Sequence, residues 1–248
     1  MSRPVQRRQP GLQYGLVLLA SQVMNFGYDS IPPATLAAIV AQSVLYMGLI
    51  RVPWNAEDVC ISASKVFKHK DWRSFILSNF EHGSDMHLYY NMVSFLLKGS
   101  FLENMYGTTN FAFLIGVISM GCSAMYVTIG YILTQITEDY AYYTSCAIGF
   151  SAVLFALKVI VVSEEQDRPH DVGGFRVPSK FAVWAELFLI HLLVPNSSFI
   201  GHLGGILVGC LYCYTFVGEI IDGKISKLTG QPIVHEEMFY RRRTFRIF

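Results

Sequence analysis

Residues 146–158 read Cys-Ala-Ile-Gly-Phe-Ser-Ala-Val-Leu-Phe-Ala-Leu-Lys, an apolar stretch that carries a single hydroxyl near its start, Ser151. Gly149 precedes this serine by two residues, so other groups can approach the backbone closely there. A second apolar stretch, 199–209, reads Phe-Ile-Gly-His-Leu-Gly-Gly-Ile-Leu-Val-Gly and carries one imidazole, His202. A serine becomes a nucleophile when a base lies beside it, and histidine is the usual base. The two stretches therefore predict a serine–histidine pair, provided that the fold brings them together.

The composition indicates a membrane protein with several spans. Of 248 residues, 52% are hydrophobic and 15% are charged, whereas soluble domains carry about 25% charged residues. The sequence contains neither a Gly-rich phosphate loop nor an HExxH motif, so we expect no nucleotide, metal or other cofactor and no nucleic-acid partner. Four of the five cysteines lie in apolar segments, where we expect small core residues: Cys122, Cys146, Cys210 and Cys213.

Hydropathy predicts an all-α bundle of six membrane-spanning helices. The six expected spans are 33–50, 86–105, 109–134, 146–162, 179–195 and 199–220. Residues 11–27 are apolar but interrupted by polar side chains, which favours an interfacial helix over a span, and a cleaved signal peptide is the alternative. A long polar connection with scattered aromatic residues, 51–85, suits a loop partly in the headgroup region.

Lysines and arginines are unevenly distributed between the two sides of this arrangement. Thirteen fall on the side of the two termini and five fall in the 51–85 loop. The positive-inside rule therefore predicts cytosolic termini and a luminal or exterior loop. We divide the chain into a cytosolic N-tail with the interfacial helix, 1–32, a catalytic core, 33–220, and a cytosolic basic tail, 221–248. A small transporter is disfavoured, because the spans carry few charges and show no inverted repeat.

Four polar side chains are expected at one depth near the luminal side. Spans two, four and six run in the same direction, and each carries such a group near its start: His87 and Asn91, Ser151, and His202. His87 and Asn91 are four residues apart and so share a helix face. Isolated polar groups are costly in hydrocarbon, so their convergence indicates a site. Each has an ordinary alternative, since a lone serine in a membrane helix usually bonds its own i−4 carbonyl and a lone histidine is usually structural.

The helix that carries His202 also carries glycines at a spacing of four, namely Gly201, Gly205 and Gly209. Such a face lets two helix backbones come unusually close, which a serine–histidine hydrogen bond requires. Ordinary helix packing is the alternative interpretation.

Three ionisable residues at membrane depth lie outside this constellation. Glu186 and His191 in span five are functional candidates by position, although the sequence assigns them no role. Lys158 lies two turns after Ser151, and we expect it to extend toward the cytosolic surface rather than take part in chemistry.

Taken together these motifs resemble the rhomboid family of intramembrane serine proteases. The resemblance covers about 33–220 and rests on Gly149-Phe-Ser151, on Gly201-His202 with its glycine spacing, and on His87-x-x-x-Asn91, with Trp72-Arg73 similar to a loop motif of the family. It implies that Ser151 is the nucleophile and His202 its general base. His87, Asn91 and the Ser151 backbone N–H would line the oxyanion hole.

Two positions depart from the family pattern. Glu103 is followed by Asn104 and Met105, whereas the family often has Glu-x-Arg, so the usual arginine-mediated tie of that turn is in doubt. Phe155 stands where the family commonly has a tyrosine.

Within the family the chain looks most like the endoplasmic-reticulum type, which is associated with the degradation of unstable membrane proteins. Its expected partners are membrane-protein substrates and the lipid bilayer. The tail residues Arg241, Arg242, Arg243 and Phe248 look similar to a segment that binds the valosin-containing AAA ATPase. A basic juxtamembrane tail that binds anionic lipid is the alternative.

A different function class also deserves comparison with the enzyme. Rhomboid relatives of the derlin kind are proteolytically inert and act as membrane-thinning scaffolds in retrotranslocation. They lack the serine–histidine pair, which this chain has in Ser151 and His202. The sequence therefore favours the protease.

Overall fold

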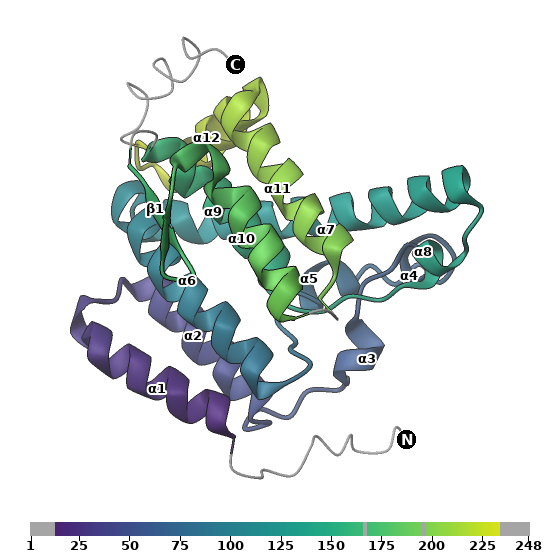
Figure 1. Cartoon of the computed structure of the whole chain (residues 1–248), viewed down its shortest axis with the longest axis horizontal. Coiled ribbons are helices and arrows are strands. Elements are labelled where there is room, and N and C mark those ends of the chain that lie inside the picture. Colours follow the sequence, from purple (N-terminus) through teal and green to yellow (C-terminus); the bar gives the residue numbers. More distant parts are fainter. Residues whose placement is uncertain (1–12, 166–167, 195–196, 234–248) are drawn as a thin grey trace.

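The computed structural model of the protein describes residues 13–165, 168–194 and 197–233 (Figure 1). The α-helices are α1 (Tyr14–Phe26), α2 (Pro33–Tyr46), α3 (Ala56–Val59), α4 (Ala63–Phe67), α5 (Ser74–Leu77), α6 (Asp85–Tyr106), α7 (Thr108–Thr137), α8 (Ala141–Thr144), α9 (Ser151–Glu164), α10 (Ser179–Leu193), α11 (Phe199–Tyr214) and α12 (Phe216–Thr229). A 3₁₀ turn, η1 (Tyr28–Ser30), and two short strands, β1 (His170–Val172) and β2 (Phe175–Val177), complete the described elements. The prediction of a mostly helical protein is confirmed.

Each predicted span overlaps a helix, but three boundaries were wrong. The first expected span runs to 50, whereas α2 ends at Tyr46. The fourth expected span starts at 146, whereas α9 starts at Ser151, because Gly149 has a φ of +119° that no helix contains. The sixth runs to 220 in the prediction, whereas α11 ends at Tyr214. Thr215 is extended there, and α12 leaves at 78° to α11.

Length and composition do not confirm six spans. Among the described residues, α7 is the one helix that is by itself long and apolar enough to cross a membrane, and the bent pair α11 and α12 adds a second if it counts as one span. Helices α2, α9, α10 and α11 have 14 to 16 residues, fewer than the roughly 20 that a full bilayer requires. The six-span topology stays a prediction.

A small hairpin departs from the all-α expectation. Strands β1 and β2 pair antiparallel within the connection between α9 and α10. Gly173 and Gly174 make the turn with φ values of +61° and +86°, which glycine adopts without strain. The Gly174 N–H donates to the Asp171 carboxylate at 3.0 Å, closing the turn.

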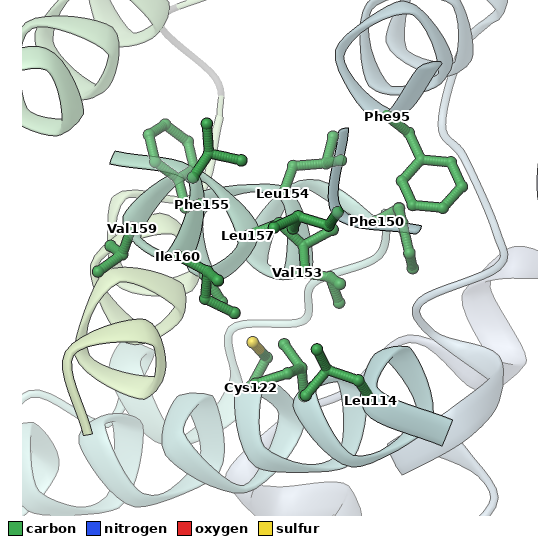
Figure 2. Close-up of a cluster of buried hydrophobic side chains, with 14 of the residues drawn as sticks. Phe95, Leu114, Cys122, Phe150, Val153, Leu154, Phe155, Leu157, Val159 and Ile160 are labelled. Atoms are coloured by element: carbon green, nitrogen blue, oxygen red, sulfur yellow. The ribbon is translucent and has the colours of Figure 1, made fainter. Parts of the chain in front are cut away.

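Helix α9 is the centre of the bundle. Apart from Lys158 and Ser163, its residues from Val153 to Ser163 are apolar, and all of them are buried, as expected for a helix surrounded by others. Figure 2 shows its side chains in contact with Phe95 of α6 and with Leu114 and Cys122 of α7. Ser151 is thus the first residue of the most enclosed helix in the described structure.

Two carboxylates of α6 fasten the N-terminal helices. Glu103 accepts hydrogen bonds from the N–H groups of Ala34 and Thr35 at 2.8 and 2.7 Å and from the Thr35 hydroxyl at 2.8 Å, so it caps the start of α2. Asp85 accepts from the Gly15 N–H at 3.0 Å, where α1 packs against α6. Glu103, which matches the glutamate of the Glu-x-Arg pattern, therefore ties α6 to α2 although Met105 stands in place of the arginine.

Candidate active site

The structure brings Ser151 and His202 into hydrogen-bond contact. Ser151 Oγ and His202 Nε2 are 3.0 Å apart, at the N-terminal ends of α9 and α11 respectively. This distance lies within the 2.6–3.2 Å range that is typical of a nucleophile and its base. Ser198 caps α11 by accepting the Gly201 N–H at 3.1 Å, which fixes the turn that carries the imidazole.

Glycines on α11 allow this approach. A Cβ at Gly205 would overlap the Ala152 carbonyl of α9, and a Cβ at Gly209 would lie 2.7 Å from Val159 Cβ and 2.8 Å from the Ala156 oxygen. Any larger residue at either position would push the two helices apart. Gly201 differs from the other two, since its nearest neighbours are the Ser198 side chain and Tyr126 of α7.

His87, Asn91 and Gly149 surround the space beside Ser151. A Cβ at Gly149 would lie 2.8 Å from His87 Nε2 and 3.8 Å from Asn91 Nδ2, so both side chains converge on this glycine. Asn91 is buried, and its Nδ2 donor has no hydrogen-bond partner within the described part of the chain. An unpaired buried donor is costly, and such groups are a feature of functional sites. The pair can supply donors to a developing negative charge.

The start of α9 adds backbone donors to the same space. The N-terminal N–H groups of a helix have no intrahelical partner, and Phe150 at the N-cap provides no side-chain hydrogen bond to them in the structure as described. The helix dipole also favours negative charge at this end. The Ser151 N–H is one of these N-terminal groups, so it is available to the oxyanion site that the family resemblance implies.

Segment 146–149 is fastened on both sides before it reaches Ser151. Ile61 and Ala147 form an antiparallel bridge with N···O distances of 2.8 and 3.0 Å, and the Gly149 N–H donates to the Ser78 carbonyl at 2.8 Å. A disulfide joins Cys60 to Cys146 with a Cα–Cα distance of 5.5 Å. The prediction that Cys146 is a small core residue was wrong, because it is exposed, precedes α9 and is disulfide-bonded to the 51–85 loop.

A cavity of ≈ 650 Å³ opens from the serine–histidine pair. Its lining comes from α6, α9, α10 and α11 and includes His87, Ser151, Glu186 and His202. Phe155 stacks on the His202 ring with centroids 4.7 Å apart and an interplanar angle of 36°. The residue that replaces the family's usual tyrosine thus supports the imidazole by ring contact.

Three charged side chains meet at Glu186, which is part of the cavity wall. Glu186 of α10 lies 2.6 Å from Lys98 of α6 and 3.3 Å from Lys158 of α9, measured from carboxylate oxygen to Nζ. Both lysine side chains are at most 10% exposed. The expectation that Lys158 extends to the cytosolic surface was wrong, since its ammonium group lies inside the bundle beside the Glu186 carboxylate. Lys98, which is one of the thirteen charges counted on the side of the termini, likewise lies in the interior.

His82 is a further histidine near the site that the sequence did not single out. It is buried in the loop before α6, and its ring lies edge-on to His87 with centroids 5.1 Å apart. Burial lowers the pKa of His82 to about 3, with the neighbouring His87 as a smaller cause. His82 is therefore neutral at physiological pH. The proposed tail residues Arg241, Arg242, Arg243 and Phe248 lie outside the described residues.

The chain matches a known protein family over most of its length. The family model described as the Rhomboid domain matches residues 69–219, which is more than half of the chain. The chain belongs to the rhomboid family. The family resemblance drawn from the sequence motifs is confirmed.

Individual rhomboids are similar to most of this chain. Rhomboid-related protein 4 from Mus musculus is 40% identical over 219 residues, covering 88% of this chain and 68% of the relative. The protein of the same name from Homo sapiens is 37% identical, covering 92% and 72%. Rhomboid-like protein 14, mitochondrial, from Arabidopsis thaliana is 38% identical, covering 83% and 63%. A more distant relative, 28% identical over about half of each chain, is named Rhomboid-type serine protease 2 and comes from Eremothecium gossypii.

Proposed function

We propose that this rhomboid is a serine endopeptidase that cleaves membrane proteins at or within their transmembrane segments. The observation that carries the proposal is the 3.0 Å contact between Ser151 Oγ and His202 Nε2. Around that contact, His87 and Asn91 converge on Gly149, the Asn91 Nδ2 donor is unpaired within the described residues, and the start of α9 adds backbone N–H groups. An inert scaffold would need none of these groups to converge.

The chemistry follows from the positions of these groups. Ser151 Oγ attacks the peptide carbonyl carbon while His202 Nε2 takes the hydroxyl proton. The oxygen of the tetrahedral intermediate becomes negative and accepts hydrogen bonds from Asn91, His87 and the Ser151 N–H. His202 then donates its proton to the leaving amine nitrogen, and the C–N bond breaks. A water molecule, deprotonated by His202, hydrolyses the acyl-enzyme and restores Ser151.

The cavity indicates what kind of segment can reach the serine. Its walls come from several helices, so a substrate that enters laterally from the membrane would have to pass between two of them to reach Ser151. A peptide bond must be extended and freed from helical hydrogen bonds before Ser151 can attack its carbonyl. Helix-breaking residues in the substrate should therefore favour cleavage, because they lower the cost of local unwinding.

Location in the endoplasmic-reticulum membrane, with cytosolic termini, is part of the proposal. The charge asymmetry supports this orientation, at 12 to 5 once Lys98 is assigned to the interior of the bundle. The disulfide between Cys60 and Cys146 supports it independently, since disulfides persist in oxidising compartments. Glycosylation acceptors inserted into 51–85 should be modified, and acceptors in the C-terminal tail should not. Modification of the tail alone would reverse the orientation.

A role in the degradation of membrane proteins rests on the tail as well as on the family type. We expect the segment with Arg241, Arg242, Arg243 and Phe248 to bind the valosin-containing AAA ATPase. Replacing the three arginines by alanine should weaken binding of the purified ATPase and leave cleavage by the isolated protein unchanged. Equal binding by both forms, with lost affinity for anionic vesicles in the variant, would support the lipid alternative.

Cleavage of a reporter transmembrane segment in proteoliposomes tests the proposed activity. Wild-type protein should produce a discrete cleavage product, and Ser151→Ala should produce none. Asn91→Ala removes one oxyanion donor, so the rate should fall on the order of 10²-fold. Equal cleavage by wild type and Ser151→Ala would exclude the mechanism. Absence of cleavage in both, with faster extraction of a misfolded membrane protein by both, would favour the derlin-like scaffold.

A further inference from the structure

The general base of the proposed dyad has a second ring nitrogen for which the sequence offers no partner. His202 Nε2 faces Ser151 Oγ. In the resting enzyme this nitrogen accepts a hydrogen bond from the Ser151 hydroxyl, so the ring hydrogen of His202 is on Nδ1. His202 is 3% exposed, and its Nδ1 has no hydrogen-bond partner among the residues that the structure describes. A buried N–H donor thus lacks an acceptor at the residue that must change its protonation during catalysis.

His191 of α10 has a buried ring nitrogen that lacks a hydrogen-bond donor. Its Nδ1 lies 2.8 Å from the Leu187 carbonyl oxygen. A carbonyl oxygen only accepts, so this nitrogen carries the ring hydrogen and Nε2 is left as an acceptor. That Nε2 is buried and likewise has no partner within the described ranges.

The two rings are neighbours. The centroids of His191 and His202 are 5.1 Å apart with an interplanar angle of 73°, and the Phe199 ring of α11 also contacts His191, with centroids 5.3 Å apart. The unpaired Nδ1–H donor of His202 therefore lies on a ring that adjoins the ring with the unpaired Nε2 acceptor of His191. A small ring rotation, or one water molecule between the nitrogens, completes the hydrogen bond.

We propose that His191 is a positioning residue for His202, accepting the hydrogen of His202 Nδ1 and so extending the dyad to a Ser151–His202–His191 chain. The inference rests on the proposed protease function. The second nitrogen's hydrogen bond sets the tautomer and orientation of a catalytic histidine. With His191 as acceptor, His202 keeps Nε2 free for the serine proton. When His202 becomes an imidazolium, the same bond orients its charge.

His191 can accept this hydrogen bond only while α10, the helix that carries it, is held against the bundle. Glu186, on the same helix, binds Lys98 of α6 and Lys158 of α9, and these ion pairs fix α10 against the bundle. The acceptor for His202 is therefore in place when α10 lies against α9 and α11. Movement of α10 away from the bundle would withdraw it.

Three replacements of His191 separate an acceptor role from simple packing. His191→Phe keeps a ring against Phe199 and His202 but has no acceptor, and His191→Leu removes both. His191→Gln loses the ring but can place an amide oxygen near the former Nε2. Loss of the group that hydrogen-bonds the second ring nitrogen of a functional histidine typically lowers activity 10- to 100-fold. We expect Phe and Leu to lower kcat by at least about 10-fold at unchanged KM, and Gln to recover most of it.

Solution NMR of ¹⁵N-histidine-labelled protein in detergent gives a readout that does not need activity. The His202 Nδ1–H resonance, assigned by its loss in His202→Gln, should show a hydrogen-bonded proton in wild type and in Ser151→Ala. It should shift or exchange rapidly in His191→Phe. An unchanged His202 resonance in His191→Phe, or wild-type kcat in that folded variant, would overturn the proposal. A changed resonance with no cleavage by wild type would support the hydrogen bond and reject the protease function instead.

Discussion

Gly205 of α11 lies directly against the carbonyl oxygen of Ala152, the residue that follows Ser151 in α9. This contact places two helix backbones close enough for Ser151 and His202 to hydrogen-bond from their first turns. The active-site distance therefore depends on a missing side chain one turn after His202.

Adding one methyl group at Gly205 should break this relationship. Gly205→Ala would force α11 away from α9, because the new Cβ overlaps backbone atoms that cannot move independently. We expect loss of cleavage together with a lower unfolding temperature. Gly116→Ala in α7 is the matched control, since nothing lies within 4 Å of its Cβ, and alanine there should stabilise the helix by up to about 1 kcal/mol. Wild-type cleavage by Gly205→Ala would mean that the spacing of the two helices does not control the site.

The disulfide provides a second test. Cys60 and Cys146 are 86 residues apart, and the bond restrains the segment that leads to Ser151. Its loss should cost up to about 4 kcal/mol by the chain-entropy argument. Reductant should therefore lower the unfolding temperature of wild type. The double variant Cys60→Ser/Cys146→Ser should start at the lower temperature and not respond. Equal unfolding of wild type with and without reductant, after mass spectrometry confirms reduction, would contradict this expectation.

Glu186 should matter more for stability than either lysine that it binds. Glu186→Gln leaves two buried ammonium groups without a counter-charge, and breaking a buried ion pair in this way costs about 3–5 kcal/mol. Lys98→Met leaves the pair between Lys158 and Glu186 balanced and should cost less. Denaturant titration of the two variants in the same detergent decides the order. A smaller loss for Glu186→Gln than for Lys98→Met would reject the three-charge description.

Acid should weaken the protein partly through His82. Its pKa is about 3 in the folded protein and 6.5 in the unfolded chain, so the unfolded state binds more protons between these values. Stability from this group is complete above pH 6.5 and declines as the pH falls, by about 2 kcal/mol at pH 5. His82→Gln should flatten the decline of the unfolding temperature over that range. His69→Gln, at an exposed position of the same loop, should retain the wild-type slope. Identical slopes for all three would exclude His82 as a cause.

The features predicted from the sequence were those that depend on the spacing of residues within one segment. The apolar segments predicted the helices, and single polar residues within them, such as Ser151 and His202, singled out the residues that meet. The spacing of four between His87 and Asn91 placed both on one helix face. These inferences needed only helix geometry and the cost of polar groups in an apolar setting.

Most features that the sequence did not predict depend on contacts between segments that are far apart in the chain. Cys60 gives no local indication of Cys146, and nothing near Glu186 predicts that lysines from α6 and α9 converge on it. The start of α9 was also missed, because the apolar run continues unbroken through 146–150 while the backbone turns at Gly149. Hydropathy alone does not detect a change of conformation inside an apolar run.

Covalent labelling of the serine tests the central claim most directly. A fluorophosphonate probe, added to the detergent-solubilised full chain, should attach to Ser151 as identified by mass spectrometry of the modified peptide. An unassisted serine is a poor nucleophile, so labelling should disappear in Ser151→Ala and fall sharply in His202→Ala. The double variant should add little to either single change, because the two residues act as one unit. Labelling at full rate in His202→Ala, or absence of labelling in folded wild type, would contradict the account.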